Sequence, residues 1–164
     1  MGLMKGGKIE GSSSSCKIDC GTGNCVGGLI GDLVDAEVIN CHSTGNVIGS
    51  KDVGGLIGTM SGGIISGIQA TSLQPAIYSF SLGKVMGNEN VGGLVGHVSN
   101  AQIYYSYSSS NIILYQAIEP KHFGGLIGYL ELVTVKNCFS MGTVLNDENS
   151  LIYTSYVGGL VGYC

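Results

Sequence analysis

The feature that most constrains this chain is a six-residue segment, Val-Gly-Gly-Leu-Ile-Gly at 26–31, that returns four more times. The copies begin at Val26, Val53, Val91, Phe123 and Val157, at intervals of 27, 38, 32 and 34 residues. Recurrence at this period is typical of repeat architectures, in which each unit packs only against its neighbours. The core of such a protein must therefore come from stacked units.

A second segment follows the first at a nearly fixed distance. It occupies 40–47 in the first unit, 105–112 in the third and 137–144 in the fourth, and in the second it lies at 78–85 after eleven extra residues. Loops at the corners of a regular body vary in length in this way. The additional residues are expected at 59–75, 113–122 and 145–156.

Each unit has the composition of short strands. Val, Ile, Tyr and Thr are frequent, Gly and Asn interrupt them, and no helical period of 3.6 persists. A unit of about 27 residues with three short strands makes one turn of a parallel β-solenoid. We therefore predict an all-β fold, a parallel β-solenoid (β-helix) of about five coils, as one repeat domain over 1–164. Full units start at 26, 53, 91 and 123, and 1–25 and 157–164 are partial units.

Two apolar columns run side by side through the repeated segment. With strict alternation, Leu29 and Ile30 face opposite ways, as do their counterparts. We expect one column to pack against a neighbouring subunit or another part of a larger protein, unless a bulge at the glycine pair turns both inward. This assembly row consists of Ile30, Ile57, Val95, Ile127 and Val161.

An aromatic column marks the second segment at His42, Phe80, Tyr107 and Phe139. Two residues further on the chain carries the apolar Leu82 and Met141, so we expect this side to point inward. If it faced solvent, it would form an aromatic stripe suited to a glycan or a protein partner. Other candidates for surface binding are Tyr104, Tyr105 and Tyr115.

Charge and hydropathy exclude several functions. Only 11% of residues are charged, the formal net charge is −4, and all basic residues are Lys. No basic patch is available for phosphates, so a nucleic-acid partner is not expected. Apolar runs are short and broken by Gly, so no transmembrane segment is expected.

Catalytic chemistry is not expected. The chain lacks the metalloprotease, serine-hydrolase, phosphate-loop and dinucleotide-binding motifs, and it has no Arg. Asp32 and Asp35 share one loop, and His42, His97 and His122 are scattered. We predict no catalytic residue, cofactor or metal site. The alternative is a polysaccharide-binding or polysaccharide-degrading β-helix, which would need converging carboxylates.

Six cysteines divide into two groups. Cys16, Cys20 and Cys25 lie in one loop-like run, where either disulfides or free thiols are possible. Cys164 is the remaining candidate for a disulfide. Cys41 and Cys138 share a phase but lie about three coils apart, roughly 14 Å at strand spacing, so both are expected to be free thiols.

The combined pattern resembles the GLUG repeat. It reads Val-Gly-Gly-Leu-Ile/Val-Gly, followed by Ile/Val-x-Asn-Cys/Ser-aromatic-Ser/Ala-x-Gly-x-Val, from 26 to 164. It departs from that pattern at Ser110 and Phe123. GLUG repeats occur in bacterial surface and secreted proteins, including adhesin-like proteins and the non-catalytic part of immunoglobulin-A-cleaving metalloproteases. The resemblance implies an extracellular or cell-surface structural or adhesive module, with a glycan or host surface protein as partner.

The two ends of the sequence are complementary parts of one coil. Residues 157–164 begin a unit and residues 1–25 resemble the later part of one. Two interpretations fit this pattern: a piece of a longer array, or subunits that stack head to tail into a filament. We favour the filament, in which Cys164 could reach the Cys16–Cys25 cluster of the next copy.

Overall fold

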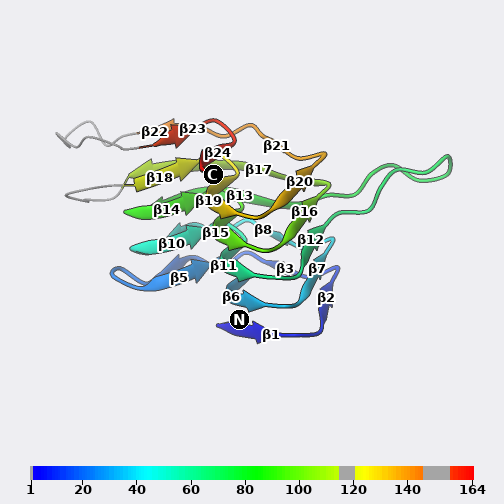
Figure 1. Cartoon of the computed structure of the whole chain (residues 1–164), viewed down its shortest axis with the longest axis horizontal. Coiled ribbons are helices and arrows are strands. Elements are labelled where there is room, and N and C mark those ends of the chain that lie inside the picture. The colour runs from blue at the N-terminus through cyan, green and yellow to red at the C-terminus, as the bar shows by residue number, and fades with distance from the viewer. Residues whose placement is uncertain (1, 115–120, 146–155) are drawn as a thin grey trace.

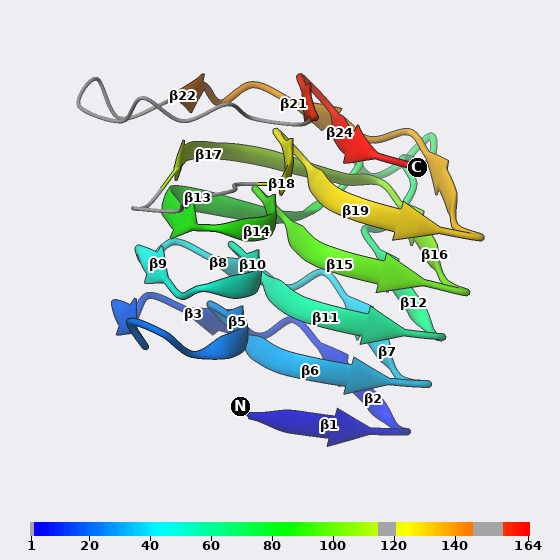
Figure 2. The ribbon, with the colours of Figure 1, turned by 60° about the vertical axis from the view of Figure 1, so that its left-hand side comes forward.

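The computed structural model describes residues 2–114, 121–145 and 156–164. These residues contain strands and no helix, and the strands of successive coils pair in parallel (Figures 1 and 2). The prediction of an all-β parallel solenoid is confirmed. Each coil passes in turn through four sheets, which we call A, B, C and D.

The strands of each sheet follow one another along the solenoid axis. Sheet A contains β1 (Leu3–Lys5), β6 (Ile30–Val34), β11 (Ile57–Ser61), β15 (Val95–Ser99), β19 (Ile127–Glu131) and β24 (Val161–Tyr163). Sheet B contains β2 (Lys8–Glu10), β7 (Glu37–Ile39), β12 (Ile64–Ser66), β16 (Gln102–Tyr104) and β20 (Thr134–Lys136). Sheet C contains β3 (Ser13–Ser14), β4 (Ile18–Asp19), β8 (His42–Ser43), β9 (Val47–Ile48), β13 (Ser79–Gly87), β17 (Ser106–Leu114), β21 (Phe139–Ser140) and β22 (Val144–Leu145). Sheet D contains β5 (Asn24–Gly27), β10 (Lys51–Gly54), β14 (Glu89–Gly92), β18 (Lys121–Gly124) and β23 (Val157–Gly158).

The strand register follows the sequence repeat. Val53 pairs with Val26 on one side and with Val91 on the other, and Ile57 pairs with Ile30 and Val95 in the same manner. The extra residues of the second unit lie between β12 and β13. They form a hairpin, with an antiparallel bridge between Ile68 and Ile77, that projects to the right in Figure 1. This insertion starts later than the predicted 59–75, because β11 and β12 keep the common register.

Both columns of the repeated segment are buried, so the predicted outward assembly row is wrong. Ile30, Ile57, Val95 and Ile127 have no exposed surface, and neither do Leu56, Leu94 and Leu126 beside them. Val161, in the last coil, is half-buried. Strict alternation fails because the Gly-Gly-Leu residues are a corner between sheets D and A rather than one continuous strand. At this corner the amides of Leu56 and Ile57 both donate to the carbonyl of Leu94, so both side chains turn inward.

The second glycine of each pair faces a serine across the core. A Cβ on Gly28, Gly55 or Gly93 would overlap the side chain of Ser43, Ser81 or Ser108, respectively. It would also meet the backbone of the neighbouring coil, such as the carbonyl oxygen of Gly125 in the case of Gly93. The glycine pair and the serine of the second segment therefore form one packing unit, repeated along the axis.

Residues in the left-handed backbone region stack at the corner between sheets A and B. Asp35, Asn100 and Leu132 have φ of 48°, 51° and 54°. Gly6 and Gly62 occupy the same corner with φ of 66° and 74°. Gly, Asn and Asp tolerate this conformation, whereas a residue such as Leu pays about 1–2 kcal/mol for it.

Leu132→Asn should stabilise the protein by about 1 kcal/mol, because it relieves backbone strain at a side chain that is 76% exposed. A rise in melting temperature would show this. Leu132→Ala keeps both the strain and the Cβ, so it is the matched control and should change stability little. Equal effects of the two substitutions would contradict the role of the backbone conformation.

Candidate functional site

The aromatic column of sheet C faces outward, so the prediction that it points inward is wrong. His42, Phe80 and Tyr107 are half-buried and Phe139 is 37% exposed. The alternate positions, which face the core, carry Ser43, Ser81, Ser108 and Ser110, all without exposed surface. Small serines point inward because the glycine corners of the facing chain leave no room for a larger side chain.

The rings of this aromatic row stack like a ladder along the axis. Ring centroids are 4.6 Å apart for His42–Phe80, 5.0 Å for Phe80–Tyr107 and 4.9 Å for Tyr107–Phe139. The interplanar angles are only 7°, 11° and 1°. Tyr78 packs edge-on against Tyr107 and Phe139. Ring faces are therefore covered by neighbouring rings, and mainly their edges remain for a ligand.

Aliphatic side chains extend this surface. Met141 and Leu145 are 63% and 52% exposed, and Leu82, Met86 and Ile113 beside them are half-buried. We call the aromatic row and these residues the apolar face of sheet C. An exposed apolar surface of this kind marks a site of interaction.

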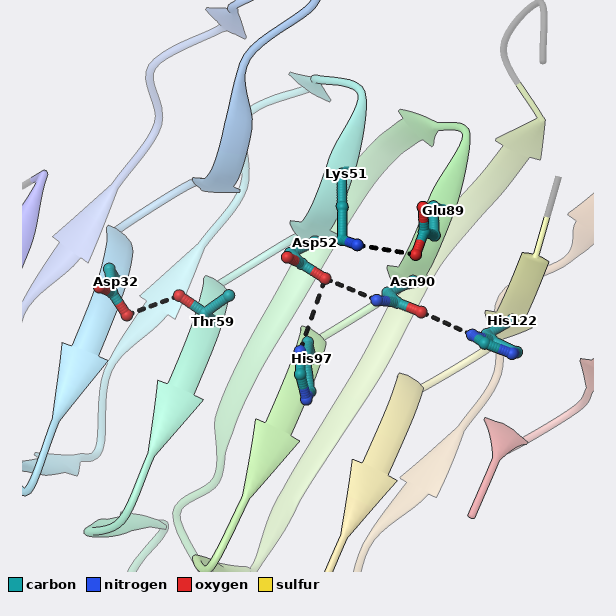
Figure 3. Close-up of polar contacts among 8 residues, drawn as sticks. All are labelled: Asp32, Lys51, Asp52, Thr59, Glu89, Asn90, His97 and His122. Carbon is teal, nitrogen blue, oxygen red and sulfur yellow. Dashed lines mark hydrogen bonds and ion pairs between the residues drawn. The ribbon is translucent and has the colours of Figure 1, made fainter. Parts of the chain in front are cut away.

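A polar network lies on another side of the solenoid, where sheet D turns into sheet A (Figure 3). The amide nitrogen of Asn90 donates to Oδ1 of Asp52 at 2.7 Å, and Oδ1 of Asn90 lies 2.6 Å from Nδ1 of His122. His97 Nδ1 is 3.7 Å from the same Asp52 oxygen. Nearby, Lys51 Nζ forms an ion pair of 2.8 Å with Glu89. Asp52 and Asn90 are buried, and the network satisfies their polar atoms.

Three members of this network share one backbone conformation. Asp52, Asn90 and His122 each precede the first residue of the repeated segment, with φ of 54°, 51° and 61°. Cys25 holds the same position in the first unit, with φ of 55°. The left-handed residue turns its side chain toward its counterpart in the next coil, so the network follows from the repeat.

The C-terminal part of the network opens into a pocket of about 240 Å³, lined by Glu89, Asn90, His97, His122, Tyr129 and Glu131. Aromatic rings form much of its wall. Tyr129 contacts His97 at 4.9 Å and His122 at 5.3 Å between ring centroids, and stacks on Tyr163 at 5.3 Å. In the described ranges, no three His, Cys, Asp or Glu side chains are placed to hold a metal ion.

The pKa of His122 is lowered from its ordinary value, mainly by burial, while the charge of Glu89 opposes this shift. In the folded state His122 therefore gives up its proton at a lower pH than in the unfolded chain, where its pKa is about 6.5. The unfolded state binds more protons between the two pKa values. The corresponding stability is present above about pH 6.5 and is lost as the pH falls through the folded-state pKa.

Acidification from pH 7.5 to pH 5 should consequently lower the melting temperature of the wild-type chain more than that of His122→Gln. Glutamine keeps a polar side chain beside Asn90 but does not titrate. Melting curves of both proteins across this range measure the difference. If the melting temperatures of both proteins fall equally with pH, His122 does not contribute to the pH dependence.

The predicted tyrosine candidates do not form a common site. Tyr104 lies on sheet B, where its hydroxyl donates to Oε1 of Gln102, and Tyr105 is at the following corner with φ of 44°. Both are half-buried. Tyr115 lies outside the described residues.

All six cysteines are free thiols in the structure. Cys16, Cys20 and Cys164 are exposed and Cys25 is half-buried, so the disulfide among these four stays a prediction for oxidising conditions. Cys41 is buried and Cys138 is half-buried, and the expectation that both remain free thiols stays a prediction. Burial raises the pKa of both, and each thiol donates to a backbone carbonyl two residues earlier.

Alkylation with iodoacetamide at pH 7.5 should therefore modify Cys16, Cys20 and Cys164 first, and Cys41 last. The thiolate is the reactive form, and a buried thiol with a raised pKa supplies little of it. Peptide mapping by mass spectrometry over time gives the order. Early modification of Cys41 in folded protein would contradict the structure.

The fold defines the class of this protein as a parallel β-solenoid with a repeated glycine corner. The GLUG motif matches residues 22–48 and 87–113, so the predicted resemblance is confirmed in these two stretches. The chain also superimposes on the crystal structure of a candidate immunoglobulin A1 protease from Bacteroides ovatus, with a TM-score of 0.63 and 17% sequence identity. The match covers 99% of this chain and 53% of that one, so this chain spans about half its length. At this identity the similarity establishes the fold alone.

No curated protein matches the sequence. In the part of the chain that the structure describes, no helix is long and apolar enough to cross a membrane.

Proposed function

We propose that this chain is a non-catalytic adhesive module of an extracellular or cell-surface protein, and that it binds a protein partner through the apolar face of sheet C. The observation that carries this proposal is the continuous outward row of aromatic and aliphatic side chains on that sheet. The GLUG motif and the likeness to a candidate immunoglobulin A1 protease support an extracellular setting.

A protein partner fits this face better than a glycan does. Sugars bind aromatic side chains mainly through open ring faces, whereas the interplanar angles of 7°, 11° and 1° leave the inner rings covered on both sides. Ring edges next to Leu82, Met86 and Met141 resemble the apolar centre of a protein interface.

Beads coated with the chain provide a direct test on cells and on immobilised extracellular proteins. We expect adhesion that is lost in the triple variant Phe139→Ser, Met141→Ser, Leu145→Ser, whose side chains are all exposed. The matched control is Gln102→Ser, Thr134→Ser, Lys136→Ser on the outer side of sheet B. Adhesion that survives the first triple variant would refute the role of the apolar face.

Polysaccharide binding or cleavage is the alternative function. The pocket that contains Glu89, Glu131 and Tyr129 favours it, because carboxylates beside aromatic rings suit sugars. A glycan array and a reducing-sugar assay with the same chain test this alternative. Glycan binding or cleavage that requires Glu131 but does not require the apolar face of sheet C would replace the adhesive proposal.

Self-association is a second candidate activity. The side chains of Val157 and Leu160 are 51% and 39% exposed, whereas their counterparts Val91 and Leu94 are completely buried. A further coil, from the same polypeptide or from a second copy, would cover them. Electron microscopy at high protein concentration, with and without reductant, tests for head-to-tail filaments. Monomers under both conditions would eliminate the filament.

A further inference from the structure

The pocket at the turn from sheet D to sheet A presents mainly hydrogen-bond acceptors. Because the Asn90 amide nitrogen donates to Asp52, its oxygen must accept from His122, which places the proton of that ring on Nδ1. Nε2 of His122 then carries a lone pair. The chain of contacts from Asp52 through Asn90 thus leaves one ring nitrogen of His122, a residue that lines the pocket, able to accept a hydrogen bond.

Two carboxylates add further acceptors. Glu131 lies at the end of β19 and is exposed, and within the described residues no ion pair engages it. Glu89 forms one ion pair with Lys51 and retains acceptor capacity, since a carboxylate offers about four lone-pair sites. An acceptor-rich pocket fits a ligand that is rich in donors.

The spacing of these acceptors distinguishes between cationic ligands. A metal ion or an ammonium group is a point charge and needs acceptors that converge on it, but no three His, Cys, Asp or Glu side chains of the described residues do so. A guanidinium group is planar, carries five N–H donors in a fixed fork, and stacks on aromatic rings. It can reach separated acceptors across a cavity of about 240 Å³ and lie against the rings of Tyr129 and His97.

We propose that this pocket, lined by Glu89, His97, His122, Tyr129 and Glu131, binds a guanidinium group. The site is separate from the apolar face of sheet C and does not depend on it. Residues 1–164 contain no arginine, so the group comes from a free guanidinium compound or from an arginine side chain outside these residues.

Titration calorimetry with N-acetyl-arginine-methylamide tests the proposal, with free arginine and N-acetyl-lysine-methylamide as comparison ligands. We expect saturable binding of the blocked arginine, and binding at least tenfold weaker in Glu131→Gln, because glutamine lacks the negative charge that strengthens a hydrogen bond to a guanidinium group. Glu37→Gln, at an exposed carboxylate on sheet B, is the matched control and should bind like the wild type.

Binding of the blocked arginine would identify a polypeptide side chain as the ligand, and binding of free arginine alone would identify a small molecule. Equal affinity for the blocked lysine would overturn the assignment to guanidinium. So would the absence of saturable binding, or an affinity that Glu131→Gln leaves unchanged. Both variants alter exposed side chains, and melting curves verify that they are folded.

Discussion

Gly93→Ala is expected to destabilise the chain by about 3 kcal/mol or more, because the added methyl group has no space. Its position would overlap the Ser108 hydroxyl and the carbonyl oxygen of Gly125. The serine could rotate away, but the carbonyl belongs to the backbone of the next coil and cannot move without breaking the stacking. Denaturant unfolding followed by circular dichroism measures the loss.

Gly159→Ala is the matched control for this experiment. Gly159 occupies the same place in the repeat, but an added Cβ there meets nothing within 4 Å in this structure. The control should keep the wild-type stability to within about 0.5 kcal/mol. Similar losses at the two positions would mean that backbone conformation, not packing against the next coil, requires the glycine.

Ile57→Lys is expected to prevent folding, with a loss of more than about 4 kcal/mol, since it places a charge without a partner in the core. Ile57 has no exposed surface and lies between Ile30 and Val95 of the neighbouring coils. If this row faced a partner subunit instead, the variant would stay folded and lose only its association.

The control lies two residues away on the same strand. Thr59 points outward on β11, where its hydroxyl donates to Oδ1 of Asp32 at 2.6 Å. Thr59→Lys replaces that hydrogen bond with an ionic contact to the Asp32 carboxylate, so it should fold with nearly wild-type stability. A folded Ile57→Lys protein would contradict the burial of the row.

The repeat allowed the solenoid and the strand register to be predicted from sequence, whereas the insertion of the second unit starts later than predicted. Identical side chains at Val26, Val53 and Val91 can pair only if successive coils stack in register. The direction of the side chains was harder to predict. Counting apolar neighbours put Phe80 and Tyr107 inside, although the core at that point accepts only serine because it meets glycine backbone.

The polar network could not have been found by motif. Asp52, Asn90 and His122 of this network are three different residue types at one position of the repeat. A possible signal was that Asp, Asn and His tolerate the left-handed conformation better than most residues. The sequence does not say that this conformation occurs there, because it arises from the corner geometry of the stacked coils.

The hairpin between β12 and β13 has a consequence for the use of this fold. Eleven extra residues enter the second coil between Ser66 and Ser79, yet Ile65 still pairs with Val38 and Ile103, and Phe80 still pairs with His42 and Tyr107. The strands on either side of the insertion keep their pairing with the neighbouring coils. The length of the insertion at this corner therefore does not change the strand register. A foreign peptide grafted at this position would be displayed away from a rigid body, and the equivalent corners of other coils would allow several peptides to be held at fixed spacings on one scaffold.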